Sequence, residues 1–153
     1  MGKPEKTNVA PVETVDTRFL EGMMGYNARR ASLAIIGLFM QRMAPYALGP
    51  VDFSVLSLVA DNPGITSRQL CSALNILPPN LVGLVNTLEK RELIARQPHP
   101  HDGRAVGLHL TETGHKLLRD AQTTACSLEI EAAAKLSATE RKTLMRLLQK
   151  IYL

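Results

Sequence analysis

The chain has 153 residues, of which 45% are hydrophobic, and its formal net charge is +4. Such a length suits one domain with a real core, and the basic balance indicates a polyanionic partner. No apolar run approaches the length of a membrane-spanning helix, and the polar first residues predict no secretory signal. The two cysteines, Cys71 and Cys126, lie far apart in the sequence, which favours a reducing, cytoplasmic location over a disulfide framework.

The N-terminal region is expected to contain a flexible arm and then a dimerisation helix. Residues 1–16 carry two prolines and mixed charges without periodicity, which is typical of a loosely attached arm. From about Thr17 to Ala44, apolar residues recur at spacings of three and four, which predicts a helix. Its second half is apolar nearly all round and must be buried on several sides. In so small a protein this implies a partner subunit, so residues 17–49 are assigned to dimerisation.

Two polar residues, Asn27 and Arg30, interrupt the apolar stripe of this helix. Because burial of a polar group is costly without a hydrogen bond, Asn27 would bond a backbone carbonyl and Arg30 would extend to solvent or pair across a dimer. Alternatively, both residues line a pocket for a small anion. With Arg18 and Tyr46 they are the candidate ligand residues, since arginine pairs well with a carboxylate.

A pair of short helices is predicted after a first buried helix at about Pro50 to Ala60. Asn62-Pro63-Gly64 forms a turn, and Thr66 with Gln69 has the form of a capping box. The helix that this box opens runs to about Leu74, where Asn75 is suited to a left-handed end. The next helix begins at Pro78 or Pro79 and runs to about Arg91.

This last helix has two contrasting faces. Its apolar stripe is formed by Leu81, Leu84, Val85 and Leu88. The opposite face carries Pro79, Gly83, Asn86 and Lys90, flanked by Asn80 and Thr87. Asparagine and threonine can bond base edges and lysine can reach phosphate or guanine, as in the second helix of a helix-turn-helix. Taken alone, the same face would equally suit the solvated side of a core helix.

A β-hairpin is predicted directly after this helix. Residues 93–97 form a short strand, residues 98–104 are rich in turn residues, and residues 105–110 alternate as a returning strand should. A hairpin in this place is the wing of a winged helix-turn-helix, which residues 50–110 would form. Arg104 near its tip suits a narrow, electronegative minor groove, and Asp102 would hold it by an ion pair.

The C-terminal residues, 111–153, are predicted to form two further dimerisation helices. Thr111 caps the first, which runs to about Lys135 and is rich in alanine. Ser137 and Glu140 form a second capping box, followed by an apolar stripe in the last helix. The fold class is therefore mainly α with a small β-wing, and residues 17–153 form a single domain.

At this point the chain resembles the MarR family of bacterial winged helix-turn-helix regulators. Residues 88–96, 102–106 and 110–114 carry the resemblance, which extends from about Phe19 to Ile151. It implies a homodimer that binds a pseudo-palindromic operator in double-stranded DNA and represses transcription. It also implies release by a small molecule, often an aromatic carboxylate, which binds between the dimerisation helices and the DNA-binding lobe. The residues assigned to DNA contact are Ser67, Arg68, Pro79, Asn80, Gly83, Asn86, Thr87, Lys90, Arg96, His101, Asp102 and Arg104.

The chain departs from the family pattern at three places. Glu92 replaces the usual glycine before the wing, which raises a question about the turn geometry there. Pro78, Pro79 and Asn80 replace a start rich in hydroxyl groups, so base contacts cannot be copied from typical members. The first helix begins without the cysteine of the oxidation-sensing branch, which argues against peroxide sensing by that route.

Other chemistry is not favoured by the sequence. His99 and His101 on a turn make a poor metal chelate, and no cofactor motif or catalytic triad order is present. Cys71 lies on a core stripe, whereas Cys126 is a candidate for a thiol pair between subunits. The sequence therefore predicts a homodimeric repressor, not an enzyme, that an aromatic carboxylate releases from DNA. The alternatives are a DNA-binding regulator without a ligand, or a protein-interaction module on a degenerate winged fold.

Overall fold

A computed structural model describes residues 15–153, together with every side chain in that range except that of Asp102. The predicted N-terminal arm therefore lies almost entirely outside the described residues. The chain divides into two compact units, one up to Leu33 and one from Ala34 onward, and each is described by itself. The helices and strands, in chain order, are α1 (Arg18–Glu21), α2 (Met24–Met43), the 3₁₀ turn η1 (Ala44–Tyr46), α3 (Pro50–Asp61), β1 (Ile65–Thr66), α4 (Ser67–Leu74), α5 (Pro78–Lys90), β2 (Ile94–His99), β3 (Asp102–Leu110), α6 (Glu112–Ala132) and α7 (Ala138–Tyr152).

The first unit contains a break that periodicity did not predict. Instead of one helix from Thr17, α1 ends at Glu21 and α2 begins at Met24. The Asn27 side-chain amide donates hydrogen bonds to the carbonyl oxygens of Glu21, at 2.7 Å, and Met23, at 2.9 Å. The Met23 carbonyl also accepts from the Asn27 N–H at 3.1 Å. The Asn27 side chain therefore joins the end of α1 to the start of α2, and the break is stabilised locally. The expectation that Asn27 bonds backbone carbonyls is confirmed, and the prediction of an unbroken helix is wrong.

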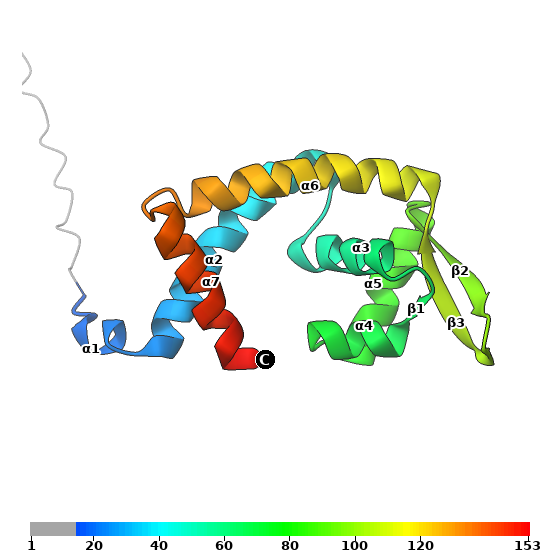
Figure 1. The fold of residues 1–153 in the computed structure, drawn as a ribbon, viewed down its shortest axis with the longest axis horizontal. Coiled ribbons are helices and arrows are strands. Elements are labelled where there is room, and N and C mark those ends of the chain that lie inside the picture. Colours follow the sequence, from blue (N-terminus) through cyan, green and yellow to red (C-terminus); the bar gives the residue numbers. More distant parts are fainter. Residues whose placement is uncertain (1–14) are drawn as a thin grey trace, which may run out of the picture. The chain divides into compact units, whose positions relative to one another are not determined.

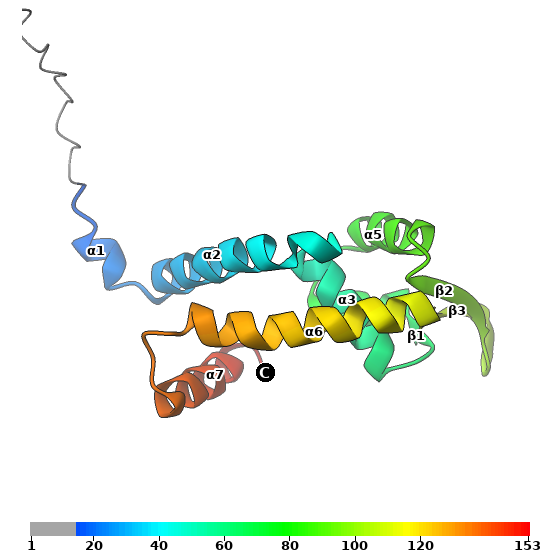
Figure 2. The same ribbon diagram turned by 90° about the horizontal axis from the view of Figure 1, so that it is seen from above.

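The second unit is built around α3, whose Val55, Leu56 and Val59 are buried. Figure 1 shows α3 between α6 on one side and α4 on the other, and Figure 2 shows α6 running across it. Leu118 and Leu128 of α6 are buried in the same core cluster as these α3 residues. Burial of this aliphatic cluster provides the main stabilisation of the unit, because apolar surface removed from water is the dominant favourable term in folding.

A three-stranded antiparallel sheet has the order β1-β3-β2. The short strand β1, which was not predicted, pairs Ile65 with Leu108. Gly64, the residue before β1, approaches β3 so closely that a Cβ on Gly107 would lie 2.9 Å from the Gly64 carbonyl oxygen. Strands β2 and β3 extend further into the hairpin than the sequence predicted, so the loop contains only Pro100 and His101. Local turn residues marked the hairpin correctly, but cross-strand pairing continues through most of them.

The junctions on both sides of the wing depend on backbone geometry. Glu92 adopts a left-handed conformation with φ 57°, so the turn after α5 keeps its form without the family glycine. Thr111 caps α6 by accepting a hydrogen bond from the Gly114 N–H at 2.9 Å. A Cβ on Gly114 would lie 2.0 Å from the Leu93 carbonyl oxygen. Glycine is therefore required at position 114 because the start of α6 lies directly against the residue that leads into β2.

The C-terminal helices follow their predicted caps. Helix α6 ends at Ala132, three residues before the predicted end, and Ser137 and Glu140 form the predicted capping box of α7. Arg42 of α2 donates to both carboxylate oxygens of Glu131 near the end of α6, with a shortest distance of 2.7 Å. This hydrogen-bonded carboxylate raises the pKa of Arg42. No single helix in the described part of the chain is long and apolar enough to cross a membrane. One bent pair of helices, Met24–Tyr46 with Pro50–Asp61, has the length and apolar composition of a membrane span only when the two are taken together.

Candidate nucleic-acid interface

Helices α4 and α5 form a helix-turn-helix whose turn is fixed by local caps. The Thr66 hydroxyl accepts from the Gln69 N–H at 3.3 Å, and the Gln69 side chain accepts from the Thr66 N–H at 2.9 Å. Asn75 then ends α4 in the left-handed conformation, with φ 50°. Both features agree with the sequence prediction. Ser67 and Arg68 are exposed in the first turn of α4.

The two faces of α5 are separated as the sequence predicted. Leu81, Val85 and Leu88 are buried, while Leu84 is half-buried. All six candidate contact residues on the opposite side are exposed: Pro79, Asn80, Gly83, Asn86, Thr87 and Lys90. The apolar face anchors the helix in the core, so its polar face is presented on a rigid element. A rigid, polar and exposed helix face has the geometry needed to enter a major groove.

Val82 lies on the exposed side of α5 and was not selected from the sequence. Its exposed fraction is 54%. It lies one turn before Asn86, so an apolar contact is available beside the polar ones. In the major groove, an apolar side chain of this kind can contact a thymine methyl group. The sequence could have indicated that Val82 is exposed, because Val82 falls outside the apolar stripe of Leu81, Val85 and Leu88.

The wing carries its basic residue near the hairpin loop, beside an aromatic pair. Arg104 is exposed on β3, and His101 is exposed in the loop. The predicted ion pair between Arg104 and Asp102 involves a side chain outside the described residues. The rings of His99 and His101 lie 6.1 Å apart in an edge-to-face arrangement. Among the described residues, no group of three metal-ligating side chains is present.

Arg96 lies on β2, but its guanidinium is turned toward α5. One terminal nitrogen donates to Asn86 Oδ1 at 2.6 Å, and the other lies 3.0 Å from Glu89 Oε2. The sequence assigned Arg96 to DNA contact. The structure instead connects it to two residues of the recognition helix, one of which was itself assigned to DNA contact.

Arg91 makes a second connection at the end of α5, which sequence reasoning missed. Its two terminal nitrogens donate to the carbonyl oxygens of Ala47 and Tyr46, both at 2.7 Å. The Tyr46 hydroxyl in turn lies 2.8 Å from the Thr124 hydroxyl of α6. These contacts attach the recognition helix to η1, and η1 to α6. Because the contacts join residues more than 40 positions apart, local sequence patterns gave no signal for them.

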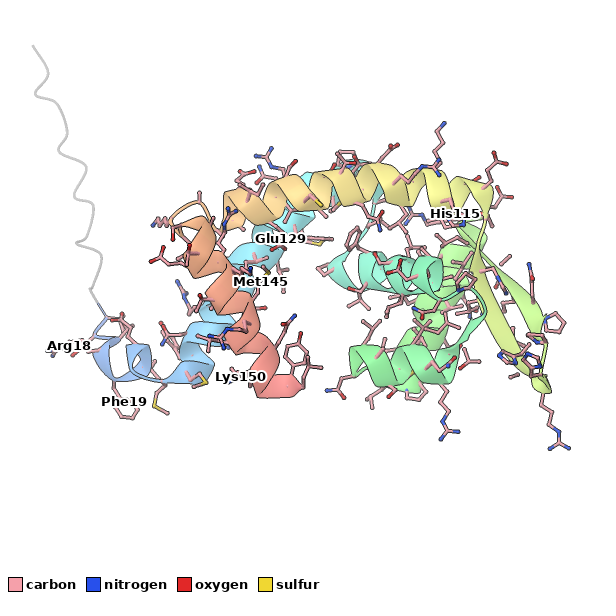
Figure 3. All side chains as sticks on the ribbon, in the orientation of Figure 1. Arg18, Phe19, His115, Glu129, Met145 and Lys150 are labelled. Carbon is pink, nitrogen blue, oxygen red and sulfur yellow. The ribbon has the colours of Figure 1, made fainter. Side chains whose placement is uncertain are left out.

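The four candidate ligand residues belong to different units: Arg18, Asn27 and Arg30 lie in the first, and Tyr46 lies in the second. In the first unit, Arg18 is exposed on α1 and donates to the Asp16 carboxylate at 2.8 Å (Figure 3). This hydrogen bond raises the pKa of Arg18. Asn27 bonds backbone carbonyls, as described above, and Arg30 is exposed. In the second unit, Tyr46 is half-buried and bonded to α6.

An open groove in the second unit, here called the α3–α6 groove, has a volume of about 630 Å³. Its apolar walls include Ile35, Phe39 and Phe53, whereas Gln122, Cys126 and Glu129 line it from α6. Glu129 is labelled on α6 in Figure 3. The groove lies beside α3, which packs in turn on α4 of the helix-turn-helix. Tyr46, which was predicted to bind a ligand, is not among its lining residues.

A winged helix-turn-helix that exposes the polar face of its second helix defines a class of DNA-binding proteins. A model of the MarR family matches residues 48–105. The chain is 30% identical over 152 residues to the "putative transcriptional regulatory protein for hcr operon" of Thauera aromatica, covering 99% of this chain and 90% of that relative.

Two solved structures of a repressor called CouR are similar over most of their length. CouR bound to a 23-mer DNA duplex has a TM-score of 0.87 and 32% identity, covering 92% of this chain and 100% of that chain. CouR bound to p-coumaroyl-CoA has a TM-score of 0.82 and 31% identity, covering 90% and 97%. The chain therefore belongs to the MarR family, whose members are DNA-binding transcriptional regulators and not enzymes.

Proposed function

We propose that this protein is a homodimeric repressor that binds a pseudo-palindromic operator, with α5 in the major groove and the wing in the minor groove. The observation that carries the proposal is the complete exposure pattern of α5: every candidate contact residue is exposed, and the opposite stripe is buried in the core. Asn80 and Lys90 supply donors for base edges and phosphates. The Thr87 hydroxyl donates to the Gly83 carbonyl oxygen at 3.0 Å and is left to act as an acceptor. Gly83 leaves room for close approach, because no atom from outside its own stretch of helix backbone lies within 4 Å of the place where its Cβ would be.

The wing supplies the second contact with DNA, in the minor groove. Arg104 is exposed on β3 near the loop, and the guanidinium group suits the negative potential of a narrow minor groove. The basic charge balance of the chain, +4, supports attraction to DNA over a longer range.

Dimerisation is supported by apolar surface that the single chain leaves uncovered. Helix α7 contains no buried residue, although Leu144, Leu147, Leu148 and Ile151 form one stripe along it. Contiguous apolar surface of this kind marks an interaction site. A second copy of the chain would cover it and would place two recognition helices on the two halves of an operator.

We further propose that a small aromatic ligand regulates DNA binding from the α3–α6 groove. The aromatic side chains Phe39 and Phe53 lie 5.7 Å apart, edge to face, and both line the groove. The sequence suggested a free aromatic carboxylate paired with arginine. The groove lining contains Glu129 and no arginine or lysine, so a free acid there would meet a negative charge. An aromatic acyl group joined in a thioester carries no carboxylate charge into the groove, and p-coumaroyl-CoA bound to CouR is an example of that ligand class.

The test is a mobility-shift titration on DNA from upstream of the protein's own gene, with random-sequence selection if that DNA is not bound. Parallel titrations contain 4-hydroxycinnamate, its coenzyme A thioester, or coenzyme A alone. We expect tight, salt-sensitive binding that the thioester weakens more than the free acid does, because a ligand shifts DNA affinity only if it binds the two states unequally. Binding that none of the compounds changes would favour a DNA-binding regulator without this ligand class. Failure to select any DNA would overturn the proposal.

Arg104→Ala separates a DNA-binding protein from an interaction module. On DNA, the variant is expected to bind more weakly on every sequence and to reduce the salt slope by about one unit. Lys142→Ala, on α7 away from the winged helix-turn-helix, is the control and should leave the slope unchanged. An unchanged slope for Arg104→Ala would contradict the assigned role of the wing.

A further inference from the structure

The side chain of Arg96 connects the wing to the recognition helix. Its guanidinium donates to Asn86 Oδ1 at 2.6 Å and pairs with Glu89 Oε2 at 3.0 Å. Asn86 and Glu89 are three residues apart on α5, so they are neighbours on its surface. The planar guanidinium can reach both at once because its donors form a fixed fork.

The pleat of β2 directs Arg96 to this position. Successive side chains of a strand alternate between faces, so Arg96 shares a face with Ile94. Ile94 is buried, and Arg96 is paired across the strands with Leu108, which is also buried. The face that carries Arg96 is therefore the one that packs on the helices. Arg96 lies two residues beyond the buried part of β2, where it meets the side of α5 instead of the core.

This contact fixes which end of the Asn86 amide is available. Arginine has only donors, so the amide must present its oxygen to the guanidinium. The NH₂ group then points away from Arg96, and Asn86 as a whole is exposed. An asparagine that reads adenine uses both ends of the amide, accepting from N6 and donating to N7. With its oxygen held by Arg96, Asn86 offers mainly donors.

We propose that Arg96 is a specificity-determining residue, which makes Asn86 a donor that reads guanine or thymine acceptors rather than a two-bond partner of adenine. Arg96 acts through Asn86 and is therefore a positioning residue. A donor alone can reach guanine N7 and O6 and thymine O4. At adenine it can reach N7, but the N6 amino group is then left without an acceptor. This inference rests on the proposed function, since it concerns how α5 reads DNA.

The competing role for Arg96 is a direct phosphate contact, as its charge suggested. Glu89 partly neutralises that charge, and the side chains of Arg96 and Glu89 are only 40% and 38% exposed. The two roles predict different measurements. A phosphate contact affects all DNA sequences equally and contributes to the salt dependence, whereas a positioning residue changes base preference at one operator position.

The experiment is random-sequence selection followed by salt titration, with the full-length wild type and the variants Arg96→Ala, Arg96→Lys and Asn86→Ala. Arg96→Lys keeps the charge but loses the planar fork, so it separates charge from orientation. Glu89→Gln is the matched control, because it removes the ion pair but leaves the bond between Arg96 and Asn86. Exposed pairs of this kind add little to stability, and thermal melting verifies that each variant is folded.

Both Arg96 variants are expected to shift one operator position toward adenine, with discrimination there changing about tenfold, which corresponds to one good base contact. Neither should reduce the salt slope by a full unit. Glu89→Gln should keep the wild-type preference. In an Asn86→Ala background, Arg96→Ala should have no further effect on base preference, because it acts through the Asn86 amide.

Each contrary outcome has a clear meaning. If Arg96→Ala weakens binding on all sequences and Arg96→Lys restores it, Arg96 contacts phosphate and the inference is overturned. If the base preference of every folded Arg96 variant matches that of the wild type, Arg96 does not position Asn86. If the folded wild type selects no DNA, the proposed function itself is overturned, which is distinguishable from either result above.

Discussion

Glu92 shows at the scale of one residue how this chain keeps a family turn without the family glycine. Its φ of 57° lies in the left-handed region, which a residue with a Cβ adopts at a cost of roughly 1–2 kcal/mol. The surrounding contacts hold it there, because the Thr111 hydroxyl donates to the Glu92 carbonyl oxygen and the Leu93 N–H donates to the Leu88 carbonyl oxygen at 3.0 Å. The position therefore stores strain that glycine would remove.

Glu92→Gly is expected to stabilise the protein by about 1 kcal/mol, since relief of the backbone strain exceeds the extra entropy of glycine in the unfolded chain. Urea unfolding measures the change in the free energy of unfolding. Glu92→Ala is the control, because it removes the carboxylate but keeps the Cβ. An equal gain in the alanine variant would assign the effect to the side chain and not to the backbone.

Gly114 illustrates the opposite constraint, which is space and not backbone conformation. A Cβ at this position would lie 2.0 Å from the Leu93 carbonyl oxygen, an atom of the backbone that cannot rotate away. Gly114→Ala is therefore expected to destabilise the protein by about 3 kcal/mol, at the upper end for overpacking. Gly83→Ala in α5, where nothing lies within 4 Å, should instead stabilise it through helix propensity. Thermal melting should show a lower Tm for Gly114→Ala and a higher Tm for Gly83→Ala.

At the scale of elements, helix ends in this protein are fixed by reciprocal caps. In α7, the Glu140 carboxylate accepts from the Ser137 N–H at 2.8 Å, and the Ser137 hydroxyl accepts from the Glu140 N–H at 3.2 Å. The hydrogen bond from the Ser137 backbone lowers the pKa of Glu140 below its ordinary value of 4.5. A lowered pKa in the folded state means that the ionised form stabilises the fold.

The stabilisation from Glu140 is expected to be complete above pH 4.5 and to be lost as the pH falls through the lower folded pKa. Glu140→Gln still accepts the Ser137 hydrogen bond but does not titrate. The difference in Tm between the wild type and this variant should therefore narrow as the pH is lowered from 6 to about 3. A difference in Tm that stays constant over this range would contradict the role of the ionised cap.

At the scale of the whole molecule, α7 and α2 leave apolar residues exposed that the proposed dimer would cover. Ile151 is 65% exposed and Met40 is 51% exposed, as expected of surfaces that a partner covers. Light scattering after gel filtration should give twice the chain mass of 16.8 kDa. Ile151→Glu should shift the protein toward monomer, because it places a charge in the apolar stripe. Lys142→Glu, on the polar side of α7, should not.

The sequence by itself determined the elements and their caps, because those depend on residues a few positions apart. The capping boxes at Thr66 and Ser137, the left-handed end at Asn75 and the two faces of α5 all follow from spacing and residue type. The tertiary structure decided the contacts between distant residues. Periodicity cannot register the break before Met24, and β1 is too short to show alternation. The bonds from Arg91 to η1 and from Arg96 to Asn86 exist only because packing brings those elements together, and packing depends on the whole core.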